Sequence, residues 1–351
     1  KIWTKDPEGL LTDFNFSKVK ENRLLILDEI HKSKNWKNKL KGIYDVHQDE
    51  LKILVTGSAR LNVYKKGGDS LLGRYLHFRL HPFSLGELSN ENVLSPEHAL
   101  QKILKPSDEM AKLNRYLADL LQFSGFPEPY LTKDERLHNI WRKDRRDRVI
   151  REDLRDLNRV QEISQLQNLA LLLPEKVGSP LSIDSLREDL STSHDSVSRW
   201  LGWFQDLYLY FEVKPWSKNI KRSLKKEGKI YLYDWTEVED PGPRFENAIA
   251  GHLLKACHLW TDLGYGQFNL HYLRNKDKDE VDFLVTKNQK PWLAVEAKVG
   301  EPQVNKKIFE RFANQIHCPF VQVTLEKDVF WKDKDRDFYS VSATQLLRFL
   351  P

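Results

Sequence analysis

The chain has 351 residues, of which 56 are Lys or Arg and 51 are Asp or Glu, and its formal net charge is +5. This length exceeds one ordinary domain, and the small net charge means that any nucleic-acid surface must come from local clusters of cations. The two cysteines, Cys257 and Cys318, exclude a disulfide framework and a four-ligand zinc site, and no apolar run is long enough to cross a bilayer, so we expect a cytoplasmic protein.

The first predicted element is a strand at residues 24–29, LLILDE, an apolar run that ends in two acids. Asp28 and Glu29 would lie at the carboxyl end of a buried parallel strand. Two interpretations stay open. In a Walker B motif, Asp28 would hold the Mg²⁺ of a bound nucleotide and Glu29 would polarise the attacking water. Otherwise the two acids belong to the N-terminus of a following helix.

A helix through Trp36 and Leu40 is expected next, followed by a second buried strand, KILVTGS, which ends in Thr56, Gly57 and Ser58. The order of strand, helix and strand resembles the second half of an AAA+ type ATPase core. In such a core a polar residue at the end of the second strand senses the γ-phosphate, and the resemblance gives this role to Ser58.

Further segments narrow the resemblance to one prokaryotic family of predicted AAA+ ATPases: DEIHK, TGS, LLGRY and HPFSLGEL all match it. In that family the arginine of LLGRY, Arg74 here, is a candidate arginine finger or phosphate sensor, and Arg60 is a weaker one. Either could instead be an ordinary surface arginine.

The chain departs from this family at one point. The Gly-x-x-x-x-Gly-Lys-Ser/Thr phosphate loop expected upstream of LLILDE is absent from the sequence, and the Gly228-Lys229 pair lacks the first glycine. The chain also opens with Lys1 rather than Met, so we expect it to be truncated upstream. ATP binding is therefore expected only in a longer chain that carries the loop.

Residues 91–160 are predicted to be helical, and the family resemblance makes them the helical lid and its connector. FSGFPEPY at 123–130 is a Gly/Pro break, and RKDRRDRVIREDLRDLNR is a helix whose charges of both signs interleave. Such interleaving favours a solvated face with ion pairs four residues apart over a DNA contact.

Residues 163–212 are predicted to form three helices: ISQLQNLALLLPEKV, SIDSLREDL and SHDSVSRWLGWFQDLYLY. Ser182 can cap the second helix, and the apolar stripe of the third leaves Arg199 exposed, as in a helix-turn-helix. Two strands, LYFEVKPW and KIYLYDW, then flank a basic wing, whose cations are Lys218, Lys221, Arg222, Lys225 and Lys226. This pattern and the family resemblance favour a winged helix that contacts DNA, although winged helices also dock proteins.

The most informative stretch is Tyr272 to Gly300. It holds two short apolar strands with acidic residues in them, Asp282 on the first and Glu296 on the second, and Lys298 shares a face with Glu296. The polar turn KNQKP predicts a hairpin that brings Asp282 near Glu296. Converging carboxylates suit Mg²⁺ or Mn²⁺, and a nearby ammonium can orient an attacking water.

Asp followed by Glu-x-Lys on the next strand resembles the PD-(D/E)XK restriction-endonuclease-like superfamily, whose motif often adds a glutamate on a preceding helix. Glu246 in PGPRFENAIAGHLLKA fits that position. The resemblance implies metal binding by Glu246, Asp282 and Glu296, and catalysis by the last two with Lys298. The alternative is an exposed edge hairpin with an ordinary Glu-Lys pair. PFVQVTL and FYSVSATQLLRFL predict a further strand and a closing strand and helix.

Together these segments predict an α/β multidomain chain, with a partial P-loop ATPase core at 1–90, a helical lid and connector at 91–160, a winged helix at 161–238 and a PD-(D/E)XK nuclease-like domain at 239–351. The resemblance implies an AAA+ type ATP-binding protein that acts on DNA, uses Mg²⁺ or Mn²⁺, and self-associates through the ATPase core. The second hypothesis is a nucleotide-regulated DNA- or protein-binding module whose nuclease fold is catalytically idle.

Overall fold

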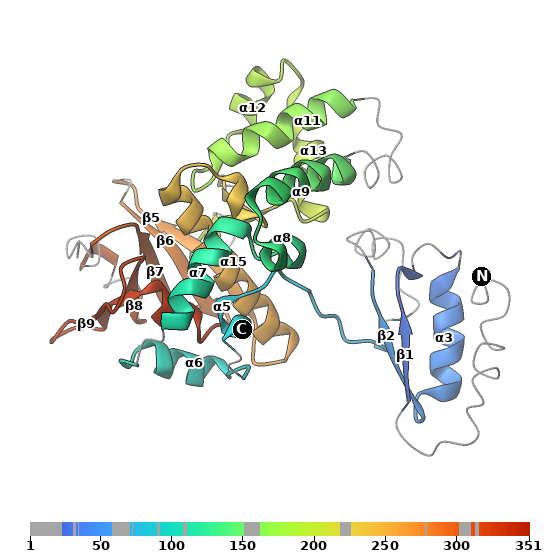
Figure 1. Cartoon of the computed structure of the whole chain (residues 1–351), viewed down its shortest axis with the longest axis horizontal. Helices are drawn as coiled ribbons and strands as arrows, with labels where there is room; N and C mark the ends of the chain where they lie inside the picture. The colour runs from blue at the N-terminus through green and yellow to red at the C-terminus, as the bar shows by residue number, and fades with distance from the viewer. Residues whose placement is uncertain are drawn as a thin grey trace. The chain divides into compact units, whose positions relative to one another are not determined.

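The computed structural model describes residues 23–30, 33, 35–57, 71, 73–89, 92–107, 111–150, 162–217, 226–277, 279–301, 310–312 and 316–351. The chain divides into two compact units, residues 1–77 (unit 1) and 78–351 (unit 2). Each unit contains its own sheet (Figure 1). Within the described residues, no helix has the length and apolar character needed to span a membrane.

Unit 1 is built on two parallel strands and a helix. Strand β1 (Arg23–Leu27) pairs with β2 (Leu51–Val55), and α3 (Trp36–His47) lies between them in the chain. The order of strand, helix and strand is as predicted. Two parallel strands need a crossover connection, and α3 lies in it. The expected full burial of both strands is wrong: one face packs on α3, but Leu24 and Ile26 on the other face are 60% and 58% exposed. In the described part of unit 1, α3 alone covers the sheet.

Unit 2 is organised around an eight-stranded mixed sheet in the order β4-β3-β5-β6-β7-β8-β10-β9. The strands are β3 (Tyr210–Pro215), β4 (Lys229–Leu232), β5 (Phe268–Arg274), β6 (Glu280–Lys287), β7 (Lys290–Lys298), β8 (Phe320–Thr324), β9 (Phe330–Lys332) and β10 (Phe338–Ser342). Strands β6 and β7 confirm the predicted hairpin. Its turn residues Asn288 and Gln289 both have positive φ, as a tight two-residue hairpin turn requires.

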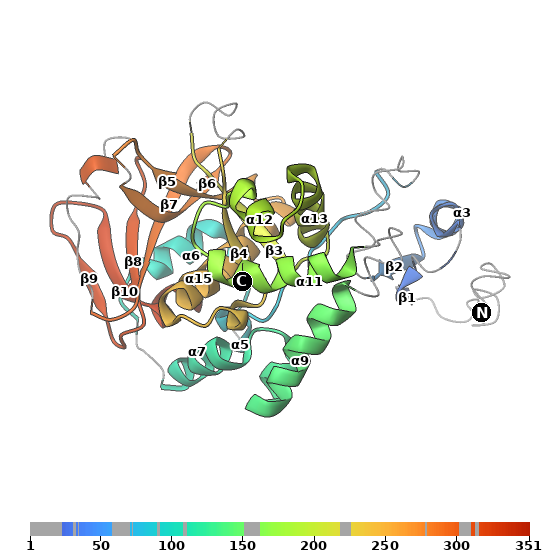
Figure 2. The same cartoon turned by 90° about the horizontal axis from the view of Figure 1, so that it is seen from above.

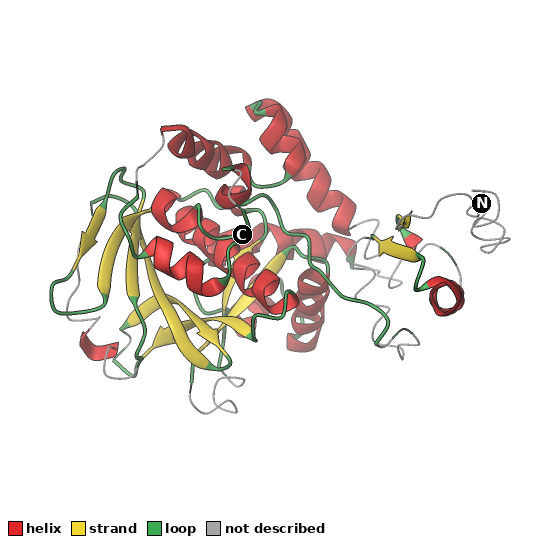
Figure 3. Cartoon of the chain, turned by 90° about the horizontal axis from the view of Figure 1, so that it is seen from below, coloured by secondary structure: helices red, strands yellow, loops and turns green. Residues whose placement is uncertain are grey.

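Helices pack against this sheet (Figure 3). Helix α15 (Pro241–Asp262) contacts β4, β5, β6 and β7, and the short closing helix α17 (Ala343–Leu347) contacts β8 and β10. The sequence predicts a linker at 240–243, DPGP, and a helix that begins near Phe245, but α15 already begins at Pro241. Asp240 caps it there by accepting a hydrogen bond from the Gly242 N–H, and Pro241 fits the first helical turn.

The segment predicted as a lid is helical in its described part. It contains α6 (Pro96–Ile103), α7 (Ala111–Phe123), α8 (Pro127–Thr132) and α9 (Glu135–Arg148), and the short helix α5 (Leu85–Leu88) precedes it, at the end of the segment predicted as the ATPase core. These helices belong to unit 2, where α7 packs on α5, α15 and α17. The helical content is therefore confirmed, and a lid function stays a prediction.

The three helices predicted before the wing are α11 (Ile163–Leu172), which continues into η5 (Leu173–Lys176), then α12 (Ile183–Asp189) and α13 (His194–Asp206). Figure 2 shows them beside β3 and β4. The two wing strands form the predicted antiparallel pair. In addition, Lys214 of β3 pairs in parallel with His271 of β5, which joins the pair to the large sheet. This pairing satisfies the backbone edge that an isolated hairpin would expose.

Candidate functional site

The residues predicted to form a nuclease-like site come together in unit 2. Asp282 on β6 and Glu296 on β7 each adjoin the cross-strand pair Phe283–Val295. The Ala297 N–H donates a hydrogen bond to Oδ2 of Asp282 at 2.9 Å, which ties this carboxylate to the neighbouring strand. Lys298 Nζ lies 3.1 Å from Glu296 Oε1. The hairpin register therefore places two carboxylates and one ammonium side by side.

Glu246 reaches the same cluster from helix α15. The Tyr231 hydroxyl donates a hydrogen bond to Glu246 Oε1 at 2.7 Å. The next residue, Asn247, fixes the helix to β4 by bonding both the N–H and the carbonyl of Leu232, at 2.8 and 2.7 Å. Gly178 lies close by with φ of 75°, and a Cβ there would come within 3.2 Å of Glu246 Oε1. Tyr231 thus holds the glutamate side chain, Asn247 fixes its helix, and Gly178 leaves room for it.

A buried lysine that the sequence analysis did not assign lies inside this cluster. Lys229 on β4 is 2% exposed, and its Nζ is 3.5 Å from Glu246 Oε1 and 4.0 Å from Asp282 Oδ1. The same ammonium forms an ion pair with Oε1 of Glu280, two residues before Asp282. Nζ also lies 5.6 Å from the ring centre of Tyr272, a cation–π distance.

Burial and mutual charge shape the acid–base properties of these groups. Burial, with the nearby Glu246 carboxylate, raises the pKa of Asp282 to about 7. Burial alone would lower the pKa of Lys229, but Glu246, Asp282 and Glu280 outweigh it, so this pKa is raised and the ammonium stays charged. Lys298 follows the same pattern, its pKa being raised by Glu296 against the effect of burial.

The cluster contains the type of ligand that a divalent metal prefers, but its side chains are not arranged as metal ligands are. Carboxylate oxygens suit Mg²⁺ and Mn²⁺. However, three carboxylates here surround the Lys229 ammonium, and within the described ranges no group of three His, Cys, Asp or Glu side chains converges as metal ligands would. A metal does not fit beside this ammonium as the side chains lie, so we assign no reaction step to one, and the predicted metal site stays a prediction.

The sequence does contain features that indicate a paired, buried Lys229. In the strand KIYL, Lys229 and Tyr231 alternate and so share a face, and a lysine at the start of a fully buried strand needs acidic partners. Glu280 shares a face with Asp282 for the same reason. What the sequence does not contain is the position of β4 relative to α15 and β6.

The predicted nucleotide-binding residues lie in unit 1. Asp28 follows β1, and the Thr56 hydroxyl, which follows β2, donates a hydrogen bond to Asp28 Oδ1 at 2.5 Å. Glu29 is in the turn after β1 with φ of 52°. Arg74 Nε is 2.7 Å from Oδ1 of Asp45 on α3. Ser58, the predicted phosphate sensor, and Arg60 are outside the described residues, and Thr56 is the polar residue found next to Asp28.

Of the predicted DNA contacts, Arg199 and Lys226 are described. The Arg199 side chain is 48% exposed on α13, with Nη2 at 3.6 Å from Glu162 Oε2 and Cζ 5.5 Å from the Trp203 ring centre. Lys226 is exposed just before β4. The other wing cations, Lys218, Lys221, Arg222 and Lys225, are outside the described residues, so DNA contact by the wing stays a prediction.

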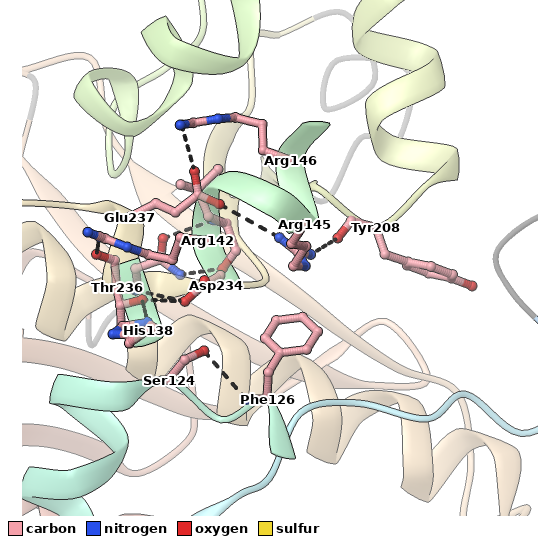
Figure 4. A network of polar contacts seen from close by, with 12 residues as sticks. Ser124, Phe126, His138, Arg142, Arg145, Arg146, Tyr208, Asp234, Thr236 and Glu237 are labelled. Atoms are coloured by element: carbon pink, nitrogen blue, oxygen red, sulfur yellow. Dashed lines mark hydrogen bonds and ion pairs between the residues drawn. The ribbon is translucent and has the colours of Figure 1, made fainter. Parts of the chain in front are cut away.

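A second polar cluster explains the charged helix α9 (Figure 4). Arg145 and Arg146 approach the two carboxylate oxygens of the partly buried Glu237 at 3.7 and 3.6 Å. Arg142 donates a hydrogen bond to the Thr236 carbonyl at 2.7 Å, and Arg145 another to the Tyr208 carbonyl at 3.2 Å. These arginines are neither a purely solvated face nor free for DNA, because they hold α9 against the segment that follows β4.

Three protein families match parts of the chain. Residues 3–89 match the AAA domain, residues 114–236 match a domain of unknown function, DUF8612, and residues 241–343 match another, DUF4143. An uncharacterised protein of Methanocaldococcus jannaschii is 25% identical over 304 residues, which are 83% of this chain and 64% of that protein. An uncharacterised protein of Haemophilus influenzae is 22% identical over 301 residues, 81% of this chain and 68% of that protein.

The chain thus spans about two thirds of the length of these relatives. No solved structure matches it significantly. The family match agrees with the two parallel strands and the Asp28–Thr56 contact of unit 1. The chain therefore contains an AAA-type ATPase-like domain within residues 3–89.

Proposed function

We propose that this protein is an AAA-type ATP-binding protein that acts on DNA, and that unit 2 carries a nuclease-like module of the PD-(D/E)XK type. One observation carries the proposal: Glu246 from a helix and Asp282, Glu296 and Lys298 from one hairpin converge on a single cluster. The AAA domain match supports the nucleotide-binding part.

In this proposal each side chain has a distinct task at a phosphodiester. The Lys298 side chain is 47% exposed and is therefore the cluster's contact with an anionic phosphate oxygen, with Glu296 holding its ammonium in position. Asp282, with a pKa of about 7, accepts the proton of an attacking water near neutral pH. As the water oxygen bonds to phosphorus, the P–O bond to the leaving sugar oxygen breaks, and that oxygen takes up a proton from solvent water.

The helices before the sheet support DNA as the substrate. Ser193 caps α13 by accepting a hydrogen bond from the Ser196 N–H, and Trp200 and Phe204 anchor the helix in the core. Arg199 therefore stays on the solvent side of α13, a helix that also contacts β3, one of the two strands that flank the basic wing. This order of helices and strands supports the proposal of a winged helix, in which the third helix and the wing would contact DNA.

A second candidate function is binding without cleavage. The observation that favours it is the Lys229 ammonium, which pairs with Glu246 and Glu280 and lies near Asp282. A nuclease-like fold whose carboxylates are already neutralised would serve recognition of DNA or of a protein, under the control of a nucleotide in the AAA domain.

Nicking of supercoiled plasmid, assayed both without added metal and in Mn²⁺, tests the first proposal. We expect nicking by the wild type and a loss of about 100-fold or more in Lys298→Ala, because this removes the group that contacts the phosphate. Lys290→Ala is the matched control, since Lys290 is an exposed lysine at the opposite end of the same strand. A wild type that binds the plasmid without nicking it supports the second candidate, and equal nicking by both variants removes Lys298 from its role.

A further inference from the structure

We propose that Lys229 is the resident cation of the carboxylate cluster, and that the cluster binds a divalent metal only when this ammonium is removed. The inference deepens the nuclease-like proposal and rests on it for the position that a metal would take. It concerns a residue on β4, a strand that the hairpin motif does not include.

The carboxylates around Lys229 come from separate parts of the chain. Carboxylates from two different elements converge on one side chain of a third: Glu246 from α15, and Glu280 and Asp282 from β6, meet Lys229 from β4. The lysine is 2% exposed, so its ammonium has exchanged its water shell for these oxygens and the Tyr272 ring. A buried charge is tolerated in this way only when it is paired.

The distances from Lys229 Nζ to the carboxylate oxygens also bear on which cation the cluster holds. The Nζ lies 3.5 Å from Glu246 Oε1 and 4.0 Å from Asp282 Oδ1. Oxygen ligands of Mg²⁺ lie at about 2.1 Å. Glu280 is in close contact with the ammonium, but Glu246 and Asp282 are spaced for a larger cation and would have to move inward to coordinate a small metal. The Tyr231 hydroxyl opposes such a movement, because it holds Glu246 Oε1 at 2.7 Å.

The charge of the cluster also favours a resident cation. It holds four carboxylates, Glu246, Glu280, Asp282 and Glu296, and two lysines, Lys229 and Lys298, with Arg274 at its edge 3.7 Å from Glu280. Without Lys229 the carboxylates facing it would repel one another in a buried site, and a divalent cation would compensate for the lost charge. Because the ammonium belongs to the chain itself, the domain folds without metal. The carboxylates around it would bind a metal only when the ammonium is removed.

The test is thermal unfolding of the full chain with and without Mn²⁺, in the absence of DNA. We expect the melting temperature of the wild type not to change with Mn²⁺. Lys229→Met should melt at a lower temperature and recover most of the loss in Mn²⁺, since a ligand that binds the folded state stabilises it. The double variant Lys229→Met/Asp282→Asn should lose that recovery, because it lacks one of the oxygens that would hold the ion.

Two controls separate charge from packing. Lys229→Arg keeps a cation and should show no response to Mn²⁺. Lys214→Met removes the lysine of another ion pair, with Glu212 on the adjacent strand β3, and should also ignore the metal. Calorimetric titration with Mn²⁺ alone should detect binding by Lys229→Met and none by the wild type.

Two results would overturn the inference. One is a wild type that binds Mn²⁺ and is stabilised by it as much as Lys229→Met, which means that metal and lysine coexist. The other is a folded Lys229→Met that ignores the metal. If Lys229→Met does not fold, Lys229→Gln repeats the test, and failure of both to fold even in Mn²⁺ also rejects it. Plasmid nicking is not involved, so this outcome is independent of the catalytic proposal.

Discussion

Asp282 is a carboxylate of the cluster whose protonation responds to burial. Its Oδ2 accepts the Ala297 N–H, whereas its Oδ1 has a distant partner, Lys229 Nζ at 4.0 Å. Burial together with Glu246 raises the pKa of this side chain to about 7. A buried carboxylate with a raised pKa destabilises the fold at any pH at which it must be charged.

The raised pKa of Asp282 predicts that the stability of the fold depends on pH. A free aspartate has a pKa of about 3.9, so between about pH 4 and pH 7 the folded chain holds a proton that the unfolded chain has lost. The stability from this group is therefore full below pH 4 and is lost as the pH rises toward 7. Asp282→Asn cannot titrate, so its stability relative to the wild type should increase over this range.

The expected gain is on the order of a few kcal/mol, because each pKa unit corresponds to about 1.4 kcal/mol. Urea unfolding of both proteins at a series of pH values measures it. Parallel stability profiles for variant and wild type between pH 4 and 7 would contradict a raised pKa at Asp282.

Some residues of the cluster were predictable from the sequence, and others were not. Asp282, Glu296 and Lys298 follow from one local hairpin, whose register the alternation of apolar residues fixes. Lys229 and Tyr231 come from a strand more than 45 residues away in the chain, and a pattern within one strand carries no information about that contact. In unit 1 the sequence did not indicate the contact between Thr56 and Asp28, because the two residues follow different strands.

At the scale of elements, the motif HPFSLGEL has a structural role within unit 2. Its residues Leu85–Leu88 form α5, closed by a capping box between Ser84 and Glu87. The Leu85 N–H donates a hydrogen bond to His252 Nε2 on α15 at 3.2 Å. Gly86 lies against the backbone carbonyls of Arg348 and Leu350, near the end of the described chain. The motif thus joins α5, α15 and the segment after α17.

The close approach at Gly86 predicts the effect of adding one methyl group. In Gly86→Ala the new Cβ would collide with the Leu350 carbonyl oxygen, a backbone atom that cannot rotate away. We expect a destabilisation of about 2 kcal/mol or more. Gly202→Ala on α13 is the matched control, because a Cβ there meets nothing within 4 Å, and it should stabilise by about 0.5–1 kcal/mol. Thermal unfolding measures both, and two variants with equal melting temperatures would show that α5 does not pack as described.

Individual helices and strands were more predictable than their assembly. The capping serines and apolar stripes of α12 and α13 are local signals, and both helices are found where expected. The pairing of β3 with β5 joins segments more than 50 residues apart, and it merges the predicted wing with the predicted nuclease sheet. Likewise, the arginines of α9 have the composition of a solvated helix but bond to Glu237.

At the scale of the whole molecule, the chain combines an AAA-type ATPase-like domain, within residues 3–89, with a carboxylate–lysine cluster on the mixed sheet of unit 2. In the function that we propose, nucleotide binding governs what unit 2 does to its partner, and this partner is DNA.

Binding of labelled duplex DNA, followed by fluorescence anisotropy between about 50 and 200 mM salt, tests that claim most directly. We expect binding whose log K falls linearly with log salt. Alanine at Lys221, Arg222, Lys225 and Lys226 should flatten the slope by up to about 0.9 per lost phosphate contact. Alanine at Lys327, Lys332 and Lys334, around β9, should leave it unchanged. No binding at low salt, or equal slopes for the wild type and the wing variant, would contradict the account.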